Sequence, residues 1–182
     1  MGQFYWKLKR YLHWTNTEVK DLLITILVVS FIFAYNDKQP SFEFSYWMFN
    51  FVLHLLIVTI VVFLYDFAHK VASIFMNIKA EYKMWSTGLL IGLVVTVLSG
   101  GKFYIILPGG VFFHHLVVQR LGHFRYGLNY FTTGFLAASG PLFLLLCATF
   151  FKTLALGNIV PLFFERITFI ALYFAIFAML PF

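Results

Sequence analysis

Charged residues are scarce in this chain of 182 residues, since only 11% of them are Asp, Glu, Lys or Arg. Soluble domains carry about a quarter charged residues, whereas 62% of this chain is hydrophobic. A soluble core cannot absorb so much apolar surface. The composition therefore excludes a soluble globular protein and predicts an integral membrane protein with a single domain over residues 1–182.

Cysteine and concentrated positive charge are also missing. Cys147 is the only cysteine, so no disulfide can form within the chain, and its apolar surroundings predict a small hydrophobic residue. The formal net charge is +6, but the basic residues are spread over segments between apolar runs. We therefore expect no nucleic acid partner. The lipid bilayer is the expected environment, and the basic residues are expected to set the orientation within it.

Long apolar runs predict an all-α integral membrane protein with about five transmembrane helices. A helix needs about 20 predominantly apolar residues to cross the hydrocarbon core. The expected spans lie near 20–36, 44–69, 84–101, 126–151 and 163–182. In the fourth span, Gly140 and Pro141 are expected to have a structural role, because a proline inside a helix kinks or interrupts it.

Residues 102–116, between the third and fourth spans, have a different pattern. Aromatic and β-branched residues flank Pro108 and Gly109, which predicts a short β-hairpin with a structural turn at these two positions. Open strand edges are not tolerated in lipid. The hairpin is therefore expected to be re-entrant or interfacial and to be covered by protein.

The N-terminal segment predicts the orientation of the chain. Residues 1–14 are basic and aromatic, as in an interfacial segment, and Thr15 and Glu18 have the spacing of a capping box. Lys and Arg concentrate before the first span and in the link over 70–83. The positive-inside rule then places the N-terminus and this link in the cytoplasm of a multi-pass protein of the cell (plasma) membrane.

The last apolar run is short. Only 16 residues follow Arg166, which gives about 24 Å of helix, less than the hydrocarbon core of about 30 Å. We therefore expect this sequence to be truncated and the natural chain to continue beyond Phe182.

An ionisable cluster ends the most apolar run. The 22 residues from Phe44 to Tyr65 contain no Asp, Glu, Lys or Arg, and then Asp66, His69 and Lys70 follow within about one helical turn. Their spacing allows all three to project from one helical face. Such a cluster is costly in a membrane and is a functional hypothesis by default. The simpler interpretation is an i, i+4 ion pair between Asp66 and Lys70.

Six short segments carry a resemblance to a known family: Thr17–Leu22, Tyr65–Lys70, Ala80–Gly88, Leu107–Phe112, Ala138–Leu142 and Met179–Phe182. In this order they resemble the site-2 protease family of intramembrane zinc metalloproteases, in its archaeal-type form. The metal helix of that family carries His-Glu-x-x-His, in which two histidines on one face bind zinc and the glutamate activates water. The resemblance implies that residues 65–69 are the corresponding stretch.

The chain departs from the family pattern at the positions that matter most. Tyr65 stands where the first histidine would be, and Asp66 stands at the position of the catalytic glutamate, while His69 keeps the second histidine. Leu144 and Ala178 replace two asparagines of the family. The aspartate that would complete the zinc site would lie beyond the last residue of this sequence.

These departures predict a catalytically inactive homologue that binds no cofactor. The resemblance implies a groove that receives a transmembrane helix of another protein, so the protein would bind such a partner or serve as a subunit of a membrane complex. An active metalloprotease remains an alternative, if His114 or His115 restores a zinc site beside His69. A proton or ion carrier that uses Asp66 and His69 is a further alternative.

Overall fold

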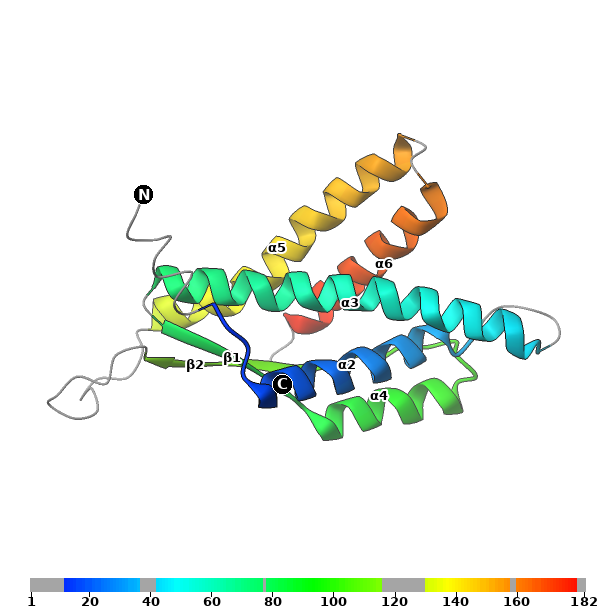
Figure 1. Ribbon diagram of the computed structural model, residues 1–182, viewed down its shortest axis with the longest axis horizontal. Helices are drawn as coiled ribbons and strands as arrows, with labels where there is room; N and C mark the ends of the chain where they lie inside the picture. Colours follow the sequence, from blue (N-terminus) through cyan, green and yellow to red (C-terminus); the bar gives the residue numbers. More distant parts are fainter. Residues whose placement is uncertain (1–11, 37–41, 77, 116–129, 158–159, 180–182) are drawn as a thin grey trace, which may run out of the picture.

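The computed structural model describes residues 12–36, 42–76, 78–115, 130–157 and 160–179. The chain folds mainly into helices, with one small antiparallel sheet (Figure 1). The elements in chain order are α2 (Asn16–Ala34), α3 (Phe44–Phe75), β1 (Ile78–Met84), α4 (Ser86–Leu98), β2 (Gly109–His115), α5 (Tyr130–Leu156) and α6 (Pro161–Ala178).

Three helices in the described part of the chain are long and apolar enough to cross a membrane, namely α3, α5 and α6. Helix α4 has 13 residues, or about 20 Å, which is less than the hydrocarbon core. Helix α2 has 19 residues, but three of them, Glu18, Lys20 and Asp21, are charged. The structure supports a membrane protein with three spanning helices by length and composition, and it does not confirm the count of about five.

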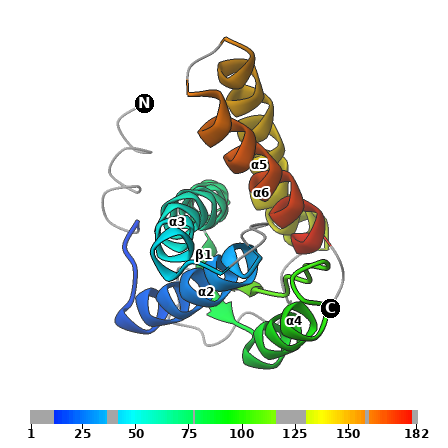
Figure 2. The same ribbon diagram turned by 90° about the vertical axis from the view of Figure 1, so that its right-hand side faces the viewer.

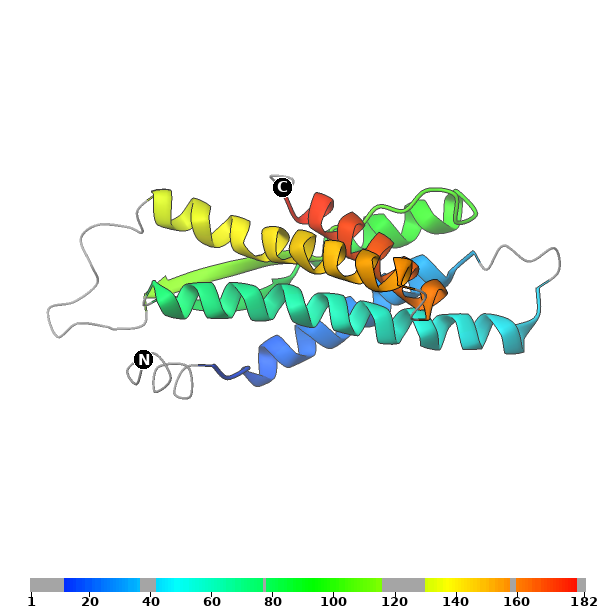
Figure 3. The same cartoon turned by 90° about the horizontal axis from the view of Figure 1, so that it is seen from above.

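Helix α3 is seen end-on in Figure 2 and contacts α2 as well as the pair α5 and α6. Helices α2 and α4 lie together on one side of it, while α5 and α6 form an antiparallel pair that packs on the other. Seen from above, α5 runs alongside α3 (Figure 3). Buried aliphatic and aromatic side chains from these five helices fill the contact region, including Val29, Val61, Leu89, Leu144 and Phe174.

The hairpin predicted over 102–116 is corrected by the structure. Only its second half is a strand, and that strand, β2, pairs with β1 rather than with residues 102–108. The register joins Ile78 to His115 and Met84 to Gly109, with α4 between the two strands in the sequence. A proline lacks the backbone N–H that a strand ladder needs. Pro108 instead uses its carbonyl, which accepts hydrogen bonds from the Tyr82 hydroxyl at 2.9 Å and the Trp85 amide at 3.1 Å.

The partner strand β1 lies where the sequence predicts only a polar link. Its charged residues, Lys79, Glu81 and Lys83, alternate with the buried Ile78, Ala80 and Tyr82. This alternation with a period of two is the signature of a half-buried strand. The alternation is visible in the sequence, but three charged residues within seven positions favoured a polar link over a strand.

Helix α5 runs through Pro141 as one helix, so of the two expected outcomes, a kink or an interruption, the interruption is not found. Both Gly140 and Pro141 are buried in the middle of the helix. The expectations for the N-terminal segment 1–14, apart from its last three residues, and for the end of the chain at 180–182 lie outside the described residues.

Candidate functional site

His69 is held in one orientation by the backbone of α5. Its ring Nδ1 lies 2.9 Å from the carbonyl oxygen of Leu136 and 3.2 Å from the hydroxyl of Ser139. A carbonyl only accepts, so Nδ1 carries a proton, and in the neutral ring Nε2 then bears the lone pair. Nε2 is buried and has no hydrogen-bond partner among the described residues. A histidine fixed in this way has the arrangement typical of a metal ligand.

Gly140 allows α5 to approach this histidine closely. A Cβ atom at position 140 would lie 2.2 Å from Nε2 of His69 and 2.9 Å from a ring carbon of Tyr65. Real Cβ contacts essentially never come so close, and both neighbouring rings are buried and packed against each other at 4.6 Å between centroids. Any side chain at position 140 would therefore push α5 away from α3.

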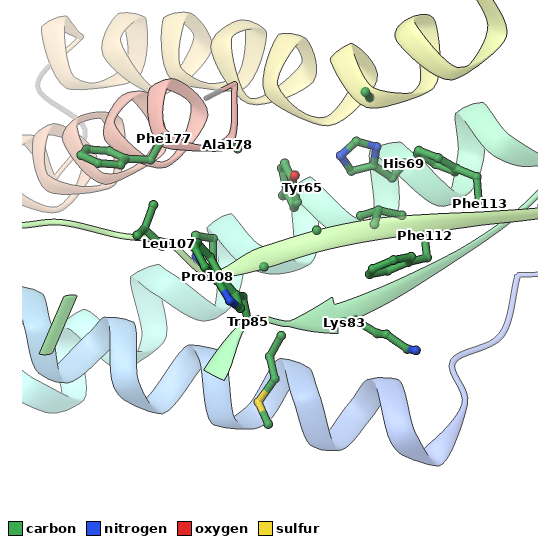
Figure 4. Close-up of a pocket in the computed structure, with 15 residues that line it drawn as sticks. Tyr65, His69, Lys83, Trp85, Leu107, Pro108, Phe112, Phe113, Phe177 and Ala178 are labelled. Atoms are coloured by element: carbon green, nitrogen blue, oxygen red, sulfur yellow. The ribbon is translucent and has the colours of Figure 1, made fainter. Parts of the chain in front are cut away.

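A cavity of about 510 Å³ opens beside Tyr65 and His69. Figure 4 shows both side chains between α5 and β2, with Phe177 and Ala178 of α6 on one side. The rest of the lining comes mainly from β2, the end of β1 and the segment before β2, and the lining residues include Lys83, Trp85, Leu107, Pro108, Gly109, Gly110, Phe112 and Phe113. The cavity is therefore largely apolar, and Tyr65 and His69 are the polar groups that α3 brings to it.

Asp66 is not part of the cavity lining. Its Oδ2 accepts a hydrogen bond from the indole Nε1 of Trp14 at 2.6 Å, and the Trp14 ring stacks on Phe63. The carboxylate is 1% exposed, and its Oδ1 has no partner among the described residues. Asp66, which the resemblance aligns with the family's catalytic glutamate, is thus bound by Trp14 rather than directed at the cavity.

Lys70 forms an ion pair with Glu18 rather than the expected pair with Asp66. The Nζ–Oε1 distance is 2.8 Å, and both side chains are at most 5% exposed. The same Oε1 accepts the amide of Tyr82 at 3.0 Å, and Oε2 accepts the amide of Thr15 at 2.9 Å. The predicted capping box is confirmed. Glu18 thereby joins the start of α2, the end of α3 and the strand β1 in one contact.

Sequence reasoning missed the role of Glu18 and of Trp14. The capping box explained Glu18 locally, and no pattern in the sequence shows that one carboxylate both caps a helix and reaches a lysine 52 positions away. Trp14 appeared only as one of several interfacial aromatic residues. Three-dimensional packing, not spacing along a helix, determines both contacts.

The two histidines proposed to restore a metal site do not join His69 in the described structure. His114 is exposed on β2 opposite Lys79 and is not among the cavity-lining residues. The backbone of His115 pairs with Ile78, and the side chain of His115 lies outside the described part. Within the described residues, no group of three His, Cys, Asp or Glu side chains could hold a metal ion.

Leu144 and Ala178, which the resemblance aligns with two asparagines of the family, lie in apolar surroundings. Leu144 is fully buried in the core, and Ala178 lines the cavity beside Phe177. Of the groups that reach the cavity from the family positions, only His69 suits zinc, since Tyr65 must lose a phenolic proton to bind a metal well. Among the described residues, the groups at this cavity therefore do not supply the three protein ligands that a catalytic zinc ion takes besides a water molecule.

Comparison with curated proteins finds one weak likeness. The chain is 26% identical over 100 residues to a protein of Methanocaldococcus jannaschii named "Putative zinc metalloprotease". The matched stretch is 55% of this chain and 47% of the relative, so the chain spans about half the length of the curated protein it matches. No family model matches the chain, and no solved structure matches it.

Proposed function

We propose that this protein is a site-2-protease-like membrane protein without proteolytic activity, whose cavity beside His69 binds a segment of another membrane protein. The observation that carries the proposal is the combination of an open apolar cavity with a single suitable metal ligand. The protein would act as a partner-binding subunit in the plasma membrane, with its N-terminus in the cytoplasm.

Two features of the site support the absence of catalysis. The phenol of Tyr65 stands in place of a zinc-binding imidazole. The carboxylate of Asp66 is held by Trp14, outside the cavity, and catalysis is lost steeply when a reacting group is misplaced by even 1 Å. A metal ion in the cavity would therefore lack protein ligands, and its bound water would lack a carboxylate to act as the general base.

The wall formed by β2 supports partner binding. Among the described residues the sheet has two strands, so each strand has one edge without a β-partner. An extended segment can add to such an edge through main-chain hydrogen bonds. Gly110 lines the cavity, and a Cβ there would meet no atom within 4 Å, which leaves room for an approaching backbone.

The first test is the zinc content of the purified full chain and of its His69→Ala variant, measured by elemental analysis in mild detergent. We expect both to contain far less than one zinc per chain. About one zinc per chain that is lost in the variant would contradict the proposal and would justify protease assays.

The second test uses a photo-crosslinking amino acid at Phe112, which is 52% exposed and lines the cavity. We expect a discrete adduct in cells that the Gly110→Leu variant removes, because the new side chain fills the cavity. Gly134→Leu is the matched control, since Gly134 also has open space around it. Phe150, exposed on α5 away from the cavity, is the control position. Equal adducts at Phe112 and Phe150, or equal loss in both glycine variants, would contradict binding in the cavity.

One observation favours the second candidate, an active metalloprotease. Nε2 of His69 is buried and has no hydrogen-bond partner among the described residues. If the missing ligands came from residues outside the described part, this nitrogen would bind zinc once α5, whose backbone at Gly140 packs against it, moved back. The zinc measurement distinguishes the two candidates directly.

A further inference from the structure

A second cavity, of about 310 Å³, lies near the opposite end of α3. It is formed by the end of α2, the first turns of α3 and α6, and the segment after α4. Aromatic side chains line one part of it, namely Phe33, Tyr104 and Phe169. Polar side chains, including Asn50, His54 and Arg166, line the other part. We call it the Arg166 cavity. It shares no residue with the cavity beside His69.

The polar wall of the Arg166 cavity is fixed by its own hydrogen bonds. The Arg166 guanidinium donates through Nη1 to the side-chain oxygen of Asn50 at 3.0 Å, and Asn50 is 7% exposed. The ring Nδ1 of His54 lies 2.8 Å from the backbone oxygen of Asn50, which can only accept. One N–H group of the guanidinium is thus anchored, and an arginine side chain carries five N–H donors in total. Because the Arg166 side chain is exposed and lines the cavity, the other donors can reach a ligand there.

The positive charge of Arg166 is not neutralised by an ion pair within the described residues. Its neighbour Glu165 also lines the cavity, but that carboxylate is paired with Lys152 at 3.9 Å. A cation anchored by Asn50, with donors that have no partner among the described residues, favours an anionic ligand. A single guanidinium is matched by a singly charged anion.

The position of the cavity along α3 matches the level of lipid head groups. Asn50 lies six residues after the first residue of α3 and 20 residues before Lys70. The second separation corresponds to about 30 Å of helix, which is the thickness of the hydrocarbon core. If the Lys70 end lies at one boundary of the core, Asn50 and Arg166 lie at the other. Aromatic and Ile170 side chains beside the cation supply apolar surface for the rest of an amphiphile.

We propose that the Arg166 cavity binds the phosphodiester of a phospholipid head group. The guanidinium holds the phosphate oxygens, Asn50 and His54 fix the guanidinium and the first turns of α3 around it, and the aromatic wall covers the glycerol and the start of the acyl chains. This binding is independent of any activity at the cavity beside His69.

The test is a lipid titration of the delipidated full chain, followed by native mass spectrometry. We expect phosphatidylglycerol to bind the wild type and to bind Arg166→Gln about tenfold or more weakly, because a charge-assisted bidentate contact is lost. Lys102→Gln is the matched control, since Lys102 is exposed just after α4 and does not line the cavity. It is expected to bind the lipid like the wild type.

Two further probes separate the phosphate from the rest of the lipid. Diacylglycerol with the same acyl chains is expected not to bind, and glycerol 3-phosphate is expected to compete only weakly. Equal binding of diacylglycerol, or equal loss in Arg166→Gln and Lys102→Gln, would overturn the proposal. Glycerol 3-phosphate that binds as tightly as the lipid would overturn the lipid as the ligand and assign a soluble phosphate.

A second variant keeps the test decisive if Arg166→Gln fails to fold. Asn50→Asp has nearly the same shape and places a carboxylate on the guanidinium. We expect it to abolish lipid binding, because the internal carboxylate then satisfies Arg166. Unchanged binding in a folded Asn50→Asp protein would count against the site.

Discussion

The two ends of α3 carry polar groups at levels about 30 Å apart, and they use them in opposite ways. At one end, a set that we call the Asp66 cluster comprises Trp14, Glu18, Asp66, His69 and Lys70. It is largely closed to solvent, because most of its donors and acceptors have an internal partner, and the two that have none among the described residues, Oδ1 of Asp66 and Nε2 of His69, are buried. At the other end, the Arg166 cavity leaves its cation exposed. Groups satisfied inside the protein hold the fold together, whereas groups left at a surface are available to a ligand.

Buried and exposed charges differ in how much free energy of unfolding is lost when they are removed. Removing one member of a buried ion pair leaves an uncompensated charge, which typically costs about 3–5 kcal/mol, while an exposed charge can be removed at little cost. Substitutions at the two ends should therefore separate stability from binding.

The largest effect is expected from Lys70→Met, which leaves the carboxylate of Glu18 buried without its cation. We expect a loss of about 3–5 kcal/mol in the free energy of unfolding, measured by denaturant titration in detergent. The double variant Glu18→Gln/Lys70→Met should lose less than the single one, because no charge is then stranded.

Lys79→Met is the matched control for this loss. Lys79 pairs with Glu81 on β1, where both side chains are partly exposed, so the expected loss is below about 1 kcal/mol. The hydrogen bond from Lys79 lowers the pKa of the Glu81 carboxyl. The small contribution of this pair is therefore present at neutral pH and disappears as the pH falls through that lowered pKa. Equal losses in Lys70→Met and Lys79→Met would refute the contrast between buried and exposed charge.

The next effect is expected from Gly140→Ala. The added methyl group would overlap His69, and overpacking of this kind costs about 1–3 kcal/mol. Gly134→Ala changes the same helix by the same atoms where nothing lies within 4 Å, and it should stabilise α5 by roughly 0.5–1 kcal/mol. Thermal unfolding of the two variants under the same conditions measures both the expected loss of stability and the expected gain. A stabilised Gly140→Ala protein would mean that α5 does not approach α3 as closely as described.

A smaller loss is expected from Trp14→Phe, which keeps an aromatic ring on Phe63 but removes the N–H donor to Asp66. The stranded acceptor should cost about 1–2 kcal/mol. The unfolding free energy in detergent is again the measurement, and Trp47→Phe, on the exposed end of α3, is the control. No difference between the two tryptophan variants would show that the indole contact contributes nothing.

The smallest stability effect is expected from Arg166→Gln, although its effect on lipid binding is the largest. Surface substitutions usually change stability by no more than about 0.5 kcal/mol, and glutamine can still donate to Asn50. The unfolding free energy of the lipid-free protein tests this, and a loss as large as that of Lys70→Met would show that the two ends do not differ.

Much of the fold could be predicted because it rests on local patterns. The capping box at Thr15 and Glu18, the long helix α3 and the apolar runs of α5 and α6 all follow from spacing and hydropathy. The strand β1 was missed although its alternation is visible, since three charges in seven residues favoured a loop. Pro108 and Gly109 predicted the turn of a hairpin, but Gly109 is the first residue of β2, and the partner of that strand lies before α4 rather than before the proline.

The candidate site was less predictable, because its contacts join distant segments. Spacing on α3 placed Asp66, His69 and Lys70 on one side of a helix, but a separation of about 60° between Asp66 and His69 around the helix axis is enough to direct them to different neighbours. His69 turns to α5 and the cavity, while Asp66 turns to Trp14. Only the packing of α2 and α5 on α3 decides this division.

The position of Glu18 has a consequence for biosynthesis. Ribosomes add about 5–20 residues per second, so roughly 3–10 seconds pass between the synthesis of Glu18 and that of Lys70, and Tyr82 follows later still. During this interval the carboxylate has none of the distant partners that it has in the finished protein. Helix α2 therefore cannot make its final contacts when it is synthesised. The first of the described helices completes its packing only after α3 and β1 have been made.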